Sequence, residues 1–201
     1  MSEPRIGRVL VASLHQAIAD LLPTRLEFYE NWLNVAGLRE GTIGLAPLSA
    51  VLSFLRTEGA PYHAITARAG AYAAEWTVRD LSPLRRRMIA VLPAAMRARA
   101  ALKITRRLVR RTYPGSRALV RVRRGGVATI DLRGSLFCEV REASAAPLCG
   151  FYRAALERVL ELFYVPAAAQ VIECRAAGSR RGCTLKVTLG SRQPDEVAGA
   201  A

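Results

Sequence analysis

The hydrophobic periodicity of the chain changes once, at Tyr113-Pro114-Gly115, and this change constrains the fold more than any other feature. Before it, apolar residues recur about every 3.6 positions, as they do on one face of a helix. After it, apolar and polar residues alternate, which is typical of strands with one buried face. The sequence therefore predicts an α+β fold, in which N-terminal helices pack with a C-terminal antiparallel sheet of about four strands and a helix.

The helical part covers residues 1–113, where proline and glycine residues divide the periodic pattern into separate helices. The predicted helices cover residues 6–22, 24–34, 45–56, 61–82, 84–91 and 94–111. Gly37 stands just beyond the second helix. The fourth is rich in alanine, whose small side chains allow another helix to approach closely.

The second part contains two pairs of strand-like runs, and Gly125-Gly126 lies between the first two as a hairpin turn. The predicted strands cover residues 117–123, 127–132, 168–175 and 182–189, with a further short extended piece over 135–140. Residues 147–164 should form a helix on one face of the sheet. We expect a single α+β domain over residues 1–190 and a flexible tail over 191–201.

The positive charge is concentrated in one quarter of the chain. The formal net charge is +14, and residues 81–130 hold fourteen basic residues and no acidic one, while the rest of the chain is balanced. The predicted helix 94–111 carries a basic stripe formed by Arg99, Lys103, Arg106, Arg107 and Arg110. This stripe is either a solvated helix face or a patch that binds an anion, such as nucleic acid, acidic lipid headgroups or a carboxylate ligand.

Several classes of function lack their signatures in this sequence. We find no helix-turn-helix signature, zinc-finger spacing or aromatic stacking platform, which argues against nucleic acid as the partner. There is no G-x-G-x-x-G after a strand and no P-loop, which argues against binding of a dinucleotide or nucleoside triphosphate. The two histidines, His15 and His63, have no carboxylate or cysteine at ligand spacing. No cofactor is evident from motifs, and a lone histidine is more often structural than a haem ligand.

The four cysteines all lie in the second part, and two of them are symmetric about a predicted turn. The midpoint between Cys174 and Cys183 falls next to Gly178, so folding the two strands about this point places the cysteines opposite each other. Cys149 opens the neighbouring helix and could approach them. This geometry suits a thiol pair, a disulfide or half of a metal site, and buried apolar packing is the remaining alternative.

The C-terminal half resembles a known family. Leu148-Cys149-Gly150-Phe151-Tyr152 opens an apolar helix and is followed by a strand, Cys174, Gly178, Cys183 and a last strand, as in the 4-vinyl reductase domain. In the middle of the chain, Ala69-Gly70-Ala71-Tyr72, Leu92-Pro93 and the arginine-rich helix are similar in order to the bacteriochlorophyll 4-vinyl reductase type. The resemblance covers about residues 60–190.

The resemblance implies a fold shared with subunits of the transport protein particle and with nitric-oxide sensors, and a pocket for a hydrocarbon, acyl or tetrapyrrole group. We take the ligand-binding candidates from this family pattern and from the basic stripe: Cys149, Phe151, Cys174, Cys183, Arg99, Lys103, Arg106 and Arg110. If the cysteines bind a metal, Cys149, Cys174 and Cys183 are its expected ligands. Because hydride transfer needs a bound donor, an accessory or carrier role in tetrapyrrole processing fits better than independent catalysis.

Two other functions stay open, namely a regulatory ligand sensor and an assembly or trafficking module without enzymatic activity. The start Met1-Ser2-Glu3-Pro4-Arg5 lacks the basic-then-apolar order of a secretory signal, so we expect a cytoplasmic protein. The partners that we expect are a small hydrophobic or tetrapyrrole ligand and, as a further hypothesis, an acidic membrane surface. The sequence leaves open whether the chain forms a homodimer.

Overall fold

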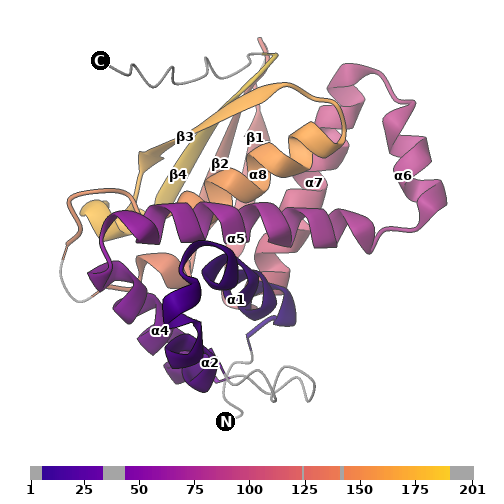
Figure 1. Cartoon of the computed structure of the whole chain (residues 1–201). Helices are drawn as coiled ribbons and strands as arrows, with labels where there is room; N and C mark the ends of the chain where they lie inside the picture. Colours follow the sequence, from indigo (N-terminus) through magenta and orange to yellow (C-terminus); the bar gives the residue numbers. More distant parts are fainter. Residues whose placement is uncertain (1–5, 34–43, 124, 141–142, 191–201) are drawn as a thin grey trace, which may run out of the picture.

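A computed structural model describes residues 6–33, 44–123, 125–140 and 143–190 (Figure 1). The helices of the first part are α1 (Arg8–Leu21), α2 (Leu26–Leu33), α4 (Leu45–Thr57), α5 (Ala60–Arg79), α6 (Pro83–Ala90) and α7 (Ala94–Thr112). The second part contains β1 (Arg117–Val122), β2 (Val127–Arg133), α8 (Gly150–Leu162), β3 (Ala167–Glu173) and β4 (Cys183–Leu189). The predicted helices and strands are therefore confirmed to within a few residues, and none of the described helices is long and apolar enough to cross a bilayer.

The four strands form one antiparallel sheet in the order β1-β2-β4-β3, which confirms the predicted α+β class. Gly125 and Gly126 adopt φ angles of 88° and 76°, which glycine tolerates without steric cost, and they connect β1 to β2. On β2 the buried residues alternate with partly exposed ones, so this strand presents one side to the core.

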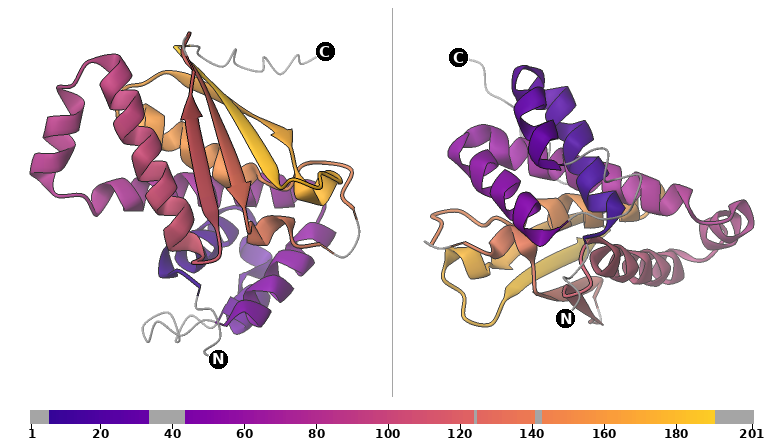
Figure 2. Two further views of the ribbon diagram at one scale, coloured as in Figure 1. Left: turned by 180° about the vertical axis from the view of Figure 1, so that it is seen from behind. Right: turned by 90° about the horizontal axis from the view of Figure 1, so that it is seen from below.

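Helix α8 lies between the sheet and α5, and α1 packs against α5, so helices stack on one face of the sheet (Figures 1 and 2). The buried apolar residues of both parts of the chain form one continuous core. The contact between α5 and α8 is close because Gly70 presents no side chain to the backbone of Phe151. The alanine-rich character of α5 is thus explained by close helix packing, as the sequence predicted.

One sequence prediction is wrong. Residues 135–140 do not form an extended piece, because Leu136–Cys138 is a turn of 3₁₀ helix. The amides of Cys138 and Glu139 donate to the carbonyls of Ser135 and Leu136, three residues back in each case. The side chains of Leu136, Phe137 and Cys138 are all buried, which an alternating strand with one solvated face does not allow. The predicted tail 191–201, Gly37 and the last residue of the second predicted helix lie outside the described residues.

The close packing of α5 on α8 predicts that one added methyl group at Gly70 destabilises the protein strongly. A Cβ on Gly70 would overlap the carbonyl oxygen of Phe151, and both atoms belong to rigid helix backbones. We expect Gly70→Ala to lower the free energy of unfolding by about 2 kcal/mol or more, as measured by urea denaturation. Gly150→Ala is the matched control, since its Cβ would lie 3.4 Å from the Thr66 hydroxyl and helix propensity favours alanine. Equal stability of the two variants would contradict this account of the interface.

Candidate metal centre

The four cysteines of the chain meet at one end of the sheet. They come from four places: Cys138 from the 3₁₀ turn after β2, Cys149 from the residue before α8, Cys174 from the residue after β3, and Cys183 from the first residue of β4. All four side chains are buried, with exposed fractions of at most 3%. The four Sγ atoms lie within 4.8 Å of one another. The fold therefore creates a compact cluster of four sulfur atoms inside the protein.

The separations within the cluster match those around a single metal ion. The Sγ atom of Cys138 lies 3.1 Å from that of Cys149, 3.5 Å from that of Cys174 and 3.4 Å from that of Cys183. A tetrahedral zinc ion with Zn–S bonds of about 2.3 Å has sulfur atoms about 3.8 Å apart. All four thiols are free, and the shortest separation is well beyond the ~2.05 Å of a disulfide bond. Four sulfur ligands at these distances suit zinc or one iron ion.

The strand register explains why Cys174 and Cys183 are close. Glu173 pairs with Thr184 as the last pair of the β3–β4 ladder, after a bulge between Val171 and Glu173, and Cys174 and Cys183 are the residues directly next to this pair. Their Sγ atoms are 4.0 Å apart. Gly178 closes the turn between them with a φ of 95°, which favours glycine. The structure thus places these cysteines opposite each other, as the symmetry about Gly178 predicted.

The other two ligand candidates come from the segment between β2 and α8. Cys183 lies beside Leu132 near the end of β2, from where the chain turns into the 3₁₀ helix that carries Cys138. Cys149 lies 3.4 Å from Cys174, measured between the Sγ atoms, so the structure brings together the three cysteines that we expected as ligands. Cys138 was not among the metal ligands predicted from the sequence. The signal that could have revealed it is the grouping of every cysteine of the chain between residues 138 and 183.

The surroundings of the cluster favour negatively charged sulfur. The backbone amide of Arg175 donates to the Sγ atom of Cys183, and the Ser135 hydroxyl donates to that of Cys138. Hydrogen bonds from the other three thiols lower the pKa of Cys174, while hydrogen bonds with its neighbours and burial raise the pKa of Cys149. The cluster without a cation therefore stabilises some thiolates at the expense of others, and a divalent cation would allow all four to be deprotonated.

Positive charge lies around the outside of the same cluster. A cleft of about 310 Å³ reaches Cys138 and Cys183 and is lined by four arginines, namely Arg133, Arg175, Arg180 and Arg181. Cys149 is also at the N-terminus of α8, where the helix dipole favours negative charge. A zinc ion with four thiolate ligands carries a net charge of −2, so these groups would stabilise the loaded centre electrostatically.

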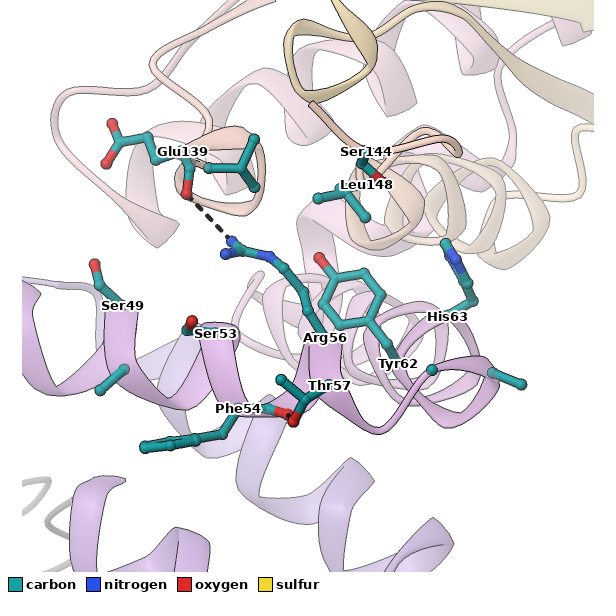
Figure 3. Close-up of a pocket in the computed structure, with 14 residues that line it drawn as sticks. Ser49, Ser53, Phe54, Arg56, Thr57, Tyr62, His63, Glu139, Ser144 and Leu148 are labelled. Atoms are coloured by element: carbon teal, nitrogen blue, oxygen red, sulfur yellow. Dashed lines mark hydrogen bonds between the residues drawn. The ribbon is translucent and has the colours of Figure 1, made fainter. Parts of the chain in front are cut away.

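A larger cavity adjoins the cysteine cluster on the side of α4 and α5. It has a volume of about 910 Å³ and is lined by Ser49, Ala50, Ser53, Phe54, Arg56, Thr57, Gly59, Ala60, Tyr62, His63, Glu139, Val140, Ser144 and Leu148. Figure 3 shows Arg56 and Tyr62 opposite Leu148 and Glu139, two residues that directly adjoin Cys149 and Cys138 in the sequence. The cavity and the cysteine cluster therefore share a wall segment.

Two polar atoms at this cavity are buried without a hydrogen-bond partner among the described residues, namely Arg56 Nε and Tyr62 Oη. A terminal nitrogen of Arg56 donates to the backbone carbonyls of Phe137 and Glu139, at 3.3 and 3.4 Å, which fixes the guanidinium. Tyr62 is only 2% exposed, and burial raises the pKa of its hydroxyl, so this group is a neutral donor at physiological pH. Buried polar atoms without partners are costly, so these two are candidates to contact a ligand.

The remaining predicted site residues lie elsewhere. Phe151 is fully buried and stacks on Phe137 with ring centroids 4.8 Å apart, and neither ring lines any of the cavities described. Lys103, Arg106 and Arg110 line a cleft of about 570 Å³ between α5 and α7, whereas Arg99 is exposed and does not line it. His15 contacts Glu30 at 2.7 Å, between α1 and α2, and His63 is exposed at the rim of the large cavity.

Comparison with known proteins gives little direct information. No family model matches the chain, and none of the curated proteins matches it. Among solved structures, the chain is similar to a variant of the Tt H-NOX protein, with 10% sequence identity and a TM-score of 0.49 over 93% of this chain and 96% of that chain. A similarity at this level supports no statement about ligand or function.

The geometry of the cluster predicts one bound metal ion per chain. We expect elemental analysis of the purified protein to find zinc in equal proportion to protein, and a strong chelator to lower the melting temperature. Cys138→Ser should reduce the metal content as strongly as Cys174→Ser, because both sulfur atoms belong to the same tetrahedron. Ser135→Ala, which removes only the hydroxyl beside Cys138, is the control that should retain the metal.

Substitution with cobalt keeps this prediction testable if the cysteine variants do not fold. Co²⁺ in a tetrahedral thiolate site gives characteristic visible absorption, which the wild-type protein should show. Protein that is free of metal, has four titratable thiols and does not respond to the chelator would contradict the prediction. The cysteines would then serve as buried apolar packing.

Proposed function

We propose that this protein binds a small organic ligand in the cavity beside the cysteine cluster, and that a zinc ion held by Cys138, Cys149, Cys174 and Cys183 stabilises the wall of that cavity. We propose further that the chain belongs to the 4-vinyl reductase domain family. Its role would then be that of an accessory or carrier protein for a tetrapyrrole whose vinyl group is reduced.

The main support for this proposal is that one segment of the chain both lines the cavity and carries two of the clustered cysteines. Glu139 and Val140 follow Cys138, Leu148 precedes Cys149, and all three line the cavity of about 910 Å³. The described residues of this segment have little regular secondary structure, so fixing both of its ends to one ion would hold them in place. The cavity volume is at the upper end of the range of roughly 300–1,000 Å³ that is typical of sites for small organic ligands.

The lining of the cavity indicates the class of ligand. Phe54, Val140 and Leu148 provide apolar surface, while Arg56 Nε and Tyr62 Oη are buried donors without a hydrogen-bond partner among the described residues. An arginine and a neutral tyrosine hydroxyl together suit a carboxylate, because arginine donates from a planar fork and the hydroxyl adds another donor. A largely apolar molecule with a carboxylate fits this lining, and a porphyrin with propionate groups is a member of this class.

The basic residues of α7 form the second part of the proposal. Lys103, Arg106 and Arg110 line a cleft that would favour an acidic partner, such as an acidic membrane surface. This partner would bind at a site separate from the cavity near the cysteines.

A regulatory sensor is the alternative that one observation favours. The segment that lines the cavity also carries two of the four proposed metal ligands, so a ligand that moves Glu139 or Leu148 would also act on the metal centre. Hydrogen exchange over the whole chain, measured with and without ligand, distinguishes the two roles. A carrier needs no change beyond the cavity lining, whereas a sensor requires a change that extends to the protein surface.

Binding of protoporphyrin IX tests the cavity directly, with the shift of the Soret band as the measurement. Tyr62→Phe is the sharpest variant. Its hydroxyl has no hydrogen bond of good geometry to the described residues, although the Arg56 side chain lies nearby, so its removal should change the stability of the unliganded protein little. We expect this variant to bind about fivefold more weakly, and Arg56→Gln about tenfold more weakly, since each loses a hydrogen bond to the carboxylate.

Tyr164→Phe and Arg153→Gln are the matched controls, because both side chains lie outside the cavity. Their affinities should equal that of the wild type. Metal content of every variant should be measured in parallel, since Arg56 also contacts the carbonyl of Phe137 beside Cys138. If both cavity variants bind the porphyrin as tightly as the wild type, this site is ruled out for the porphyrin.

A further inference from the structure

Helix α6 exposes a stripe of large apolar side chains. Leu84, Met88 and Val91 are spaced four and three residues apart, so they lie on one side of the helix, and they are 70%, 61% and 82% exposed. Met96, at the start of α7, is 50% exposed and belongs to the same corner of the molecule. Single exposed apolar residues are normal on protein surfaces, but an aligned group of this size indicates an interaction site.

The position of α6 makes this stripe accessible. Its main packing partner is α7, and Ile89 is its buried residue. Figure 1 shows α6 projecting at a corner of the molecule, away from the sheet, and both views in Figure 2 place it at the margin. Within the described part of the chain nothing covers the outer side of α6.

The surroundings of this apolar stripe are strongly basic. Arg85, Arg86 and Arg87 follow Leu84 on α6, and residues 81–130 contain no acidic residue. The neighbouring cleft of about 570 Å³ between α5 and α7 is lined by six basic side chains, namely Arg85, Lys103, Arg106, Arg107, Arg110 and Arg111. Among the described residues, Arg111 is the one of these six that forms an ion pair, at 3.3 Å from Asp80.

A buried polar atom in the cleft supports binding of an oxyanion there. Thr77 lines the cleft and is 1% exposed, and its Oγ1 atom has no hydrogen-bond partner among the described residues. A phosphate oxygen could accept from this hydroxyl while neighbouring arginines bind its other oxygens. The cleft therefore has the donors and the charge that a phosphate group requires.

We infer that α6 and the adjacent cleft dock this protein on the surface of an anionic phospholipid bilayer. Leu84, Met88, Val91 and Met96 would insert among the headgroups and upper acyl chains, while the arginines and Lys103 bind lipid phosphates. Charge complementarity selects this partner. Six basic side chains line the cleft and Asp80, which is paired with Arg111, is the one acidic residue among its described lining, so apolar residues beside this cleft match an anionic membrane surface. This inference deepens the second part of the proposed function and is independent of the cavity beside the cysteines.

Sedimentation with vesicles tests the inference on the full chain. The probes are vesicles of phosphatidylcholine alone and of equal parts phosphatidylcholine and phosphatidylglycerol. We expect binding to the anionic vesicles only, with affinity that falls as salt rises, because exposed charges are screened over about 8–10 Å at physiological ionic strength.

Two variants separate the apolar and the electrostatic contributions. The first variant combines Leu84→Gln, Met88→Gln and Val91→Gln. It should bind at least tenfold more weakly, because each substitution removes the favourable free energy of moving an apolar side chain from water into the membrane. The second, Lys103→Gln with Arg106→Gln and Arg110→Gln, should also lose at least tenfold, because each cation near an anionic surface contributes roughly a fivefold factor.

Matched controls remove the same residue types elsewhere. Leu119→Gln with Val122→Gln and Ile172→Gln changes three exposed apolar residues of the sheet, and Arg8→Gln with Arg117→Gln and Arg123→Gln removes three exposed arginines outside the corner. Both controls should bind anionic vesicles within about twofold of the wild type. If they weaken binding as much as the corner variants do, attraction of the whole basic protein explains it and the inference fails.

The oligomeric state and the porphyrin affinity complete the test. A wild-type dimer that becomes monomeric in the α6 variant, together with no vesicle binding, would assign the apolar stripe to a second copy and overturn the inference. Porphyrin binding should be unchanged in the α6 variant, because its residues lie outside the cavity. Failure of vesicle binding with intact porphyrin binding would therefore reject the membrane site and leave the proposed ligand site standing.

Discussion

The meeting of four thiols at one end of the sheet is the constraint on which the site depends. Four buried sulfur atoms within 4.8 Å cannot all be ionised unless a cation lies between them, and left protonated they offer few strong hydrogen bonds to one another. A single tetrahedral ion would resolve this conflict. Held by the four cysteines, it would also join the chain after β2, the start of α8, the end of β3 and the start of β4.

The sequence contained enough local information for the fold but not for the complete site. The change of period at Pro114 and the turn at Gly178 are local features, so the strands and the pairing of Cys174 with Cys183 followed from residues close together in the chain. Cys138 is different, because its place depends on how the chain turns after β2. In an extended segment, successive side chains would point alternately to the core and to the solvent. The 3₁₀ turn instead buries three consecutive side chains, including that of Cys138. The cavity was not predictable either, since Arg56 and Leu148 meet only through tertiary packing.

The distribution of charge along the sequence predicted the basic region correctly but not which of its residues share a cleft. The concentration of basic residues in 81–130 was evident from the sequence, but the sequence grouped Arg99 with Lys103, Arg106 and Arg110 by helical spacing alone. In the structure α5 closes one side of a cleft against the last three and leaves Arg99 outside it. The exposed apolar stripe of α6 could not be predicted from the sequence, because periodicity shows that a helix has an apolar side and cannot show whether the protein covers that side.

Helix α5 connects the two regions that the structure singles out. Tyr62, near its N-terminus, lines the cavity beside the cysteines, and Thr77, near its C-terminus, lines the basic cleft. They are fifteen positions apart, which corresponds to roughly 22 Å along the helix at 1.5 Å per residue. The close packing of Gly70 against the backbone of α8 holds the middle of α5 firmly, so the helix acts as a spacer of fixed length. A ligand in the cavity is therefore held away from the surface that binds α6. Transfer of the ligand from the cavity to that surface would require the ligand to leave the cavity, because α5 does not bend to bring the two sites together.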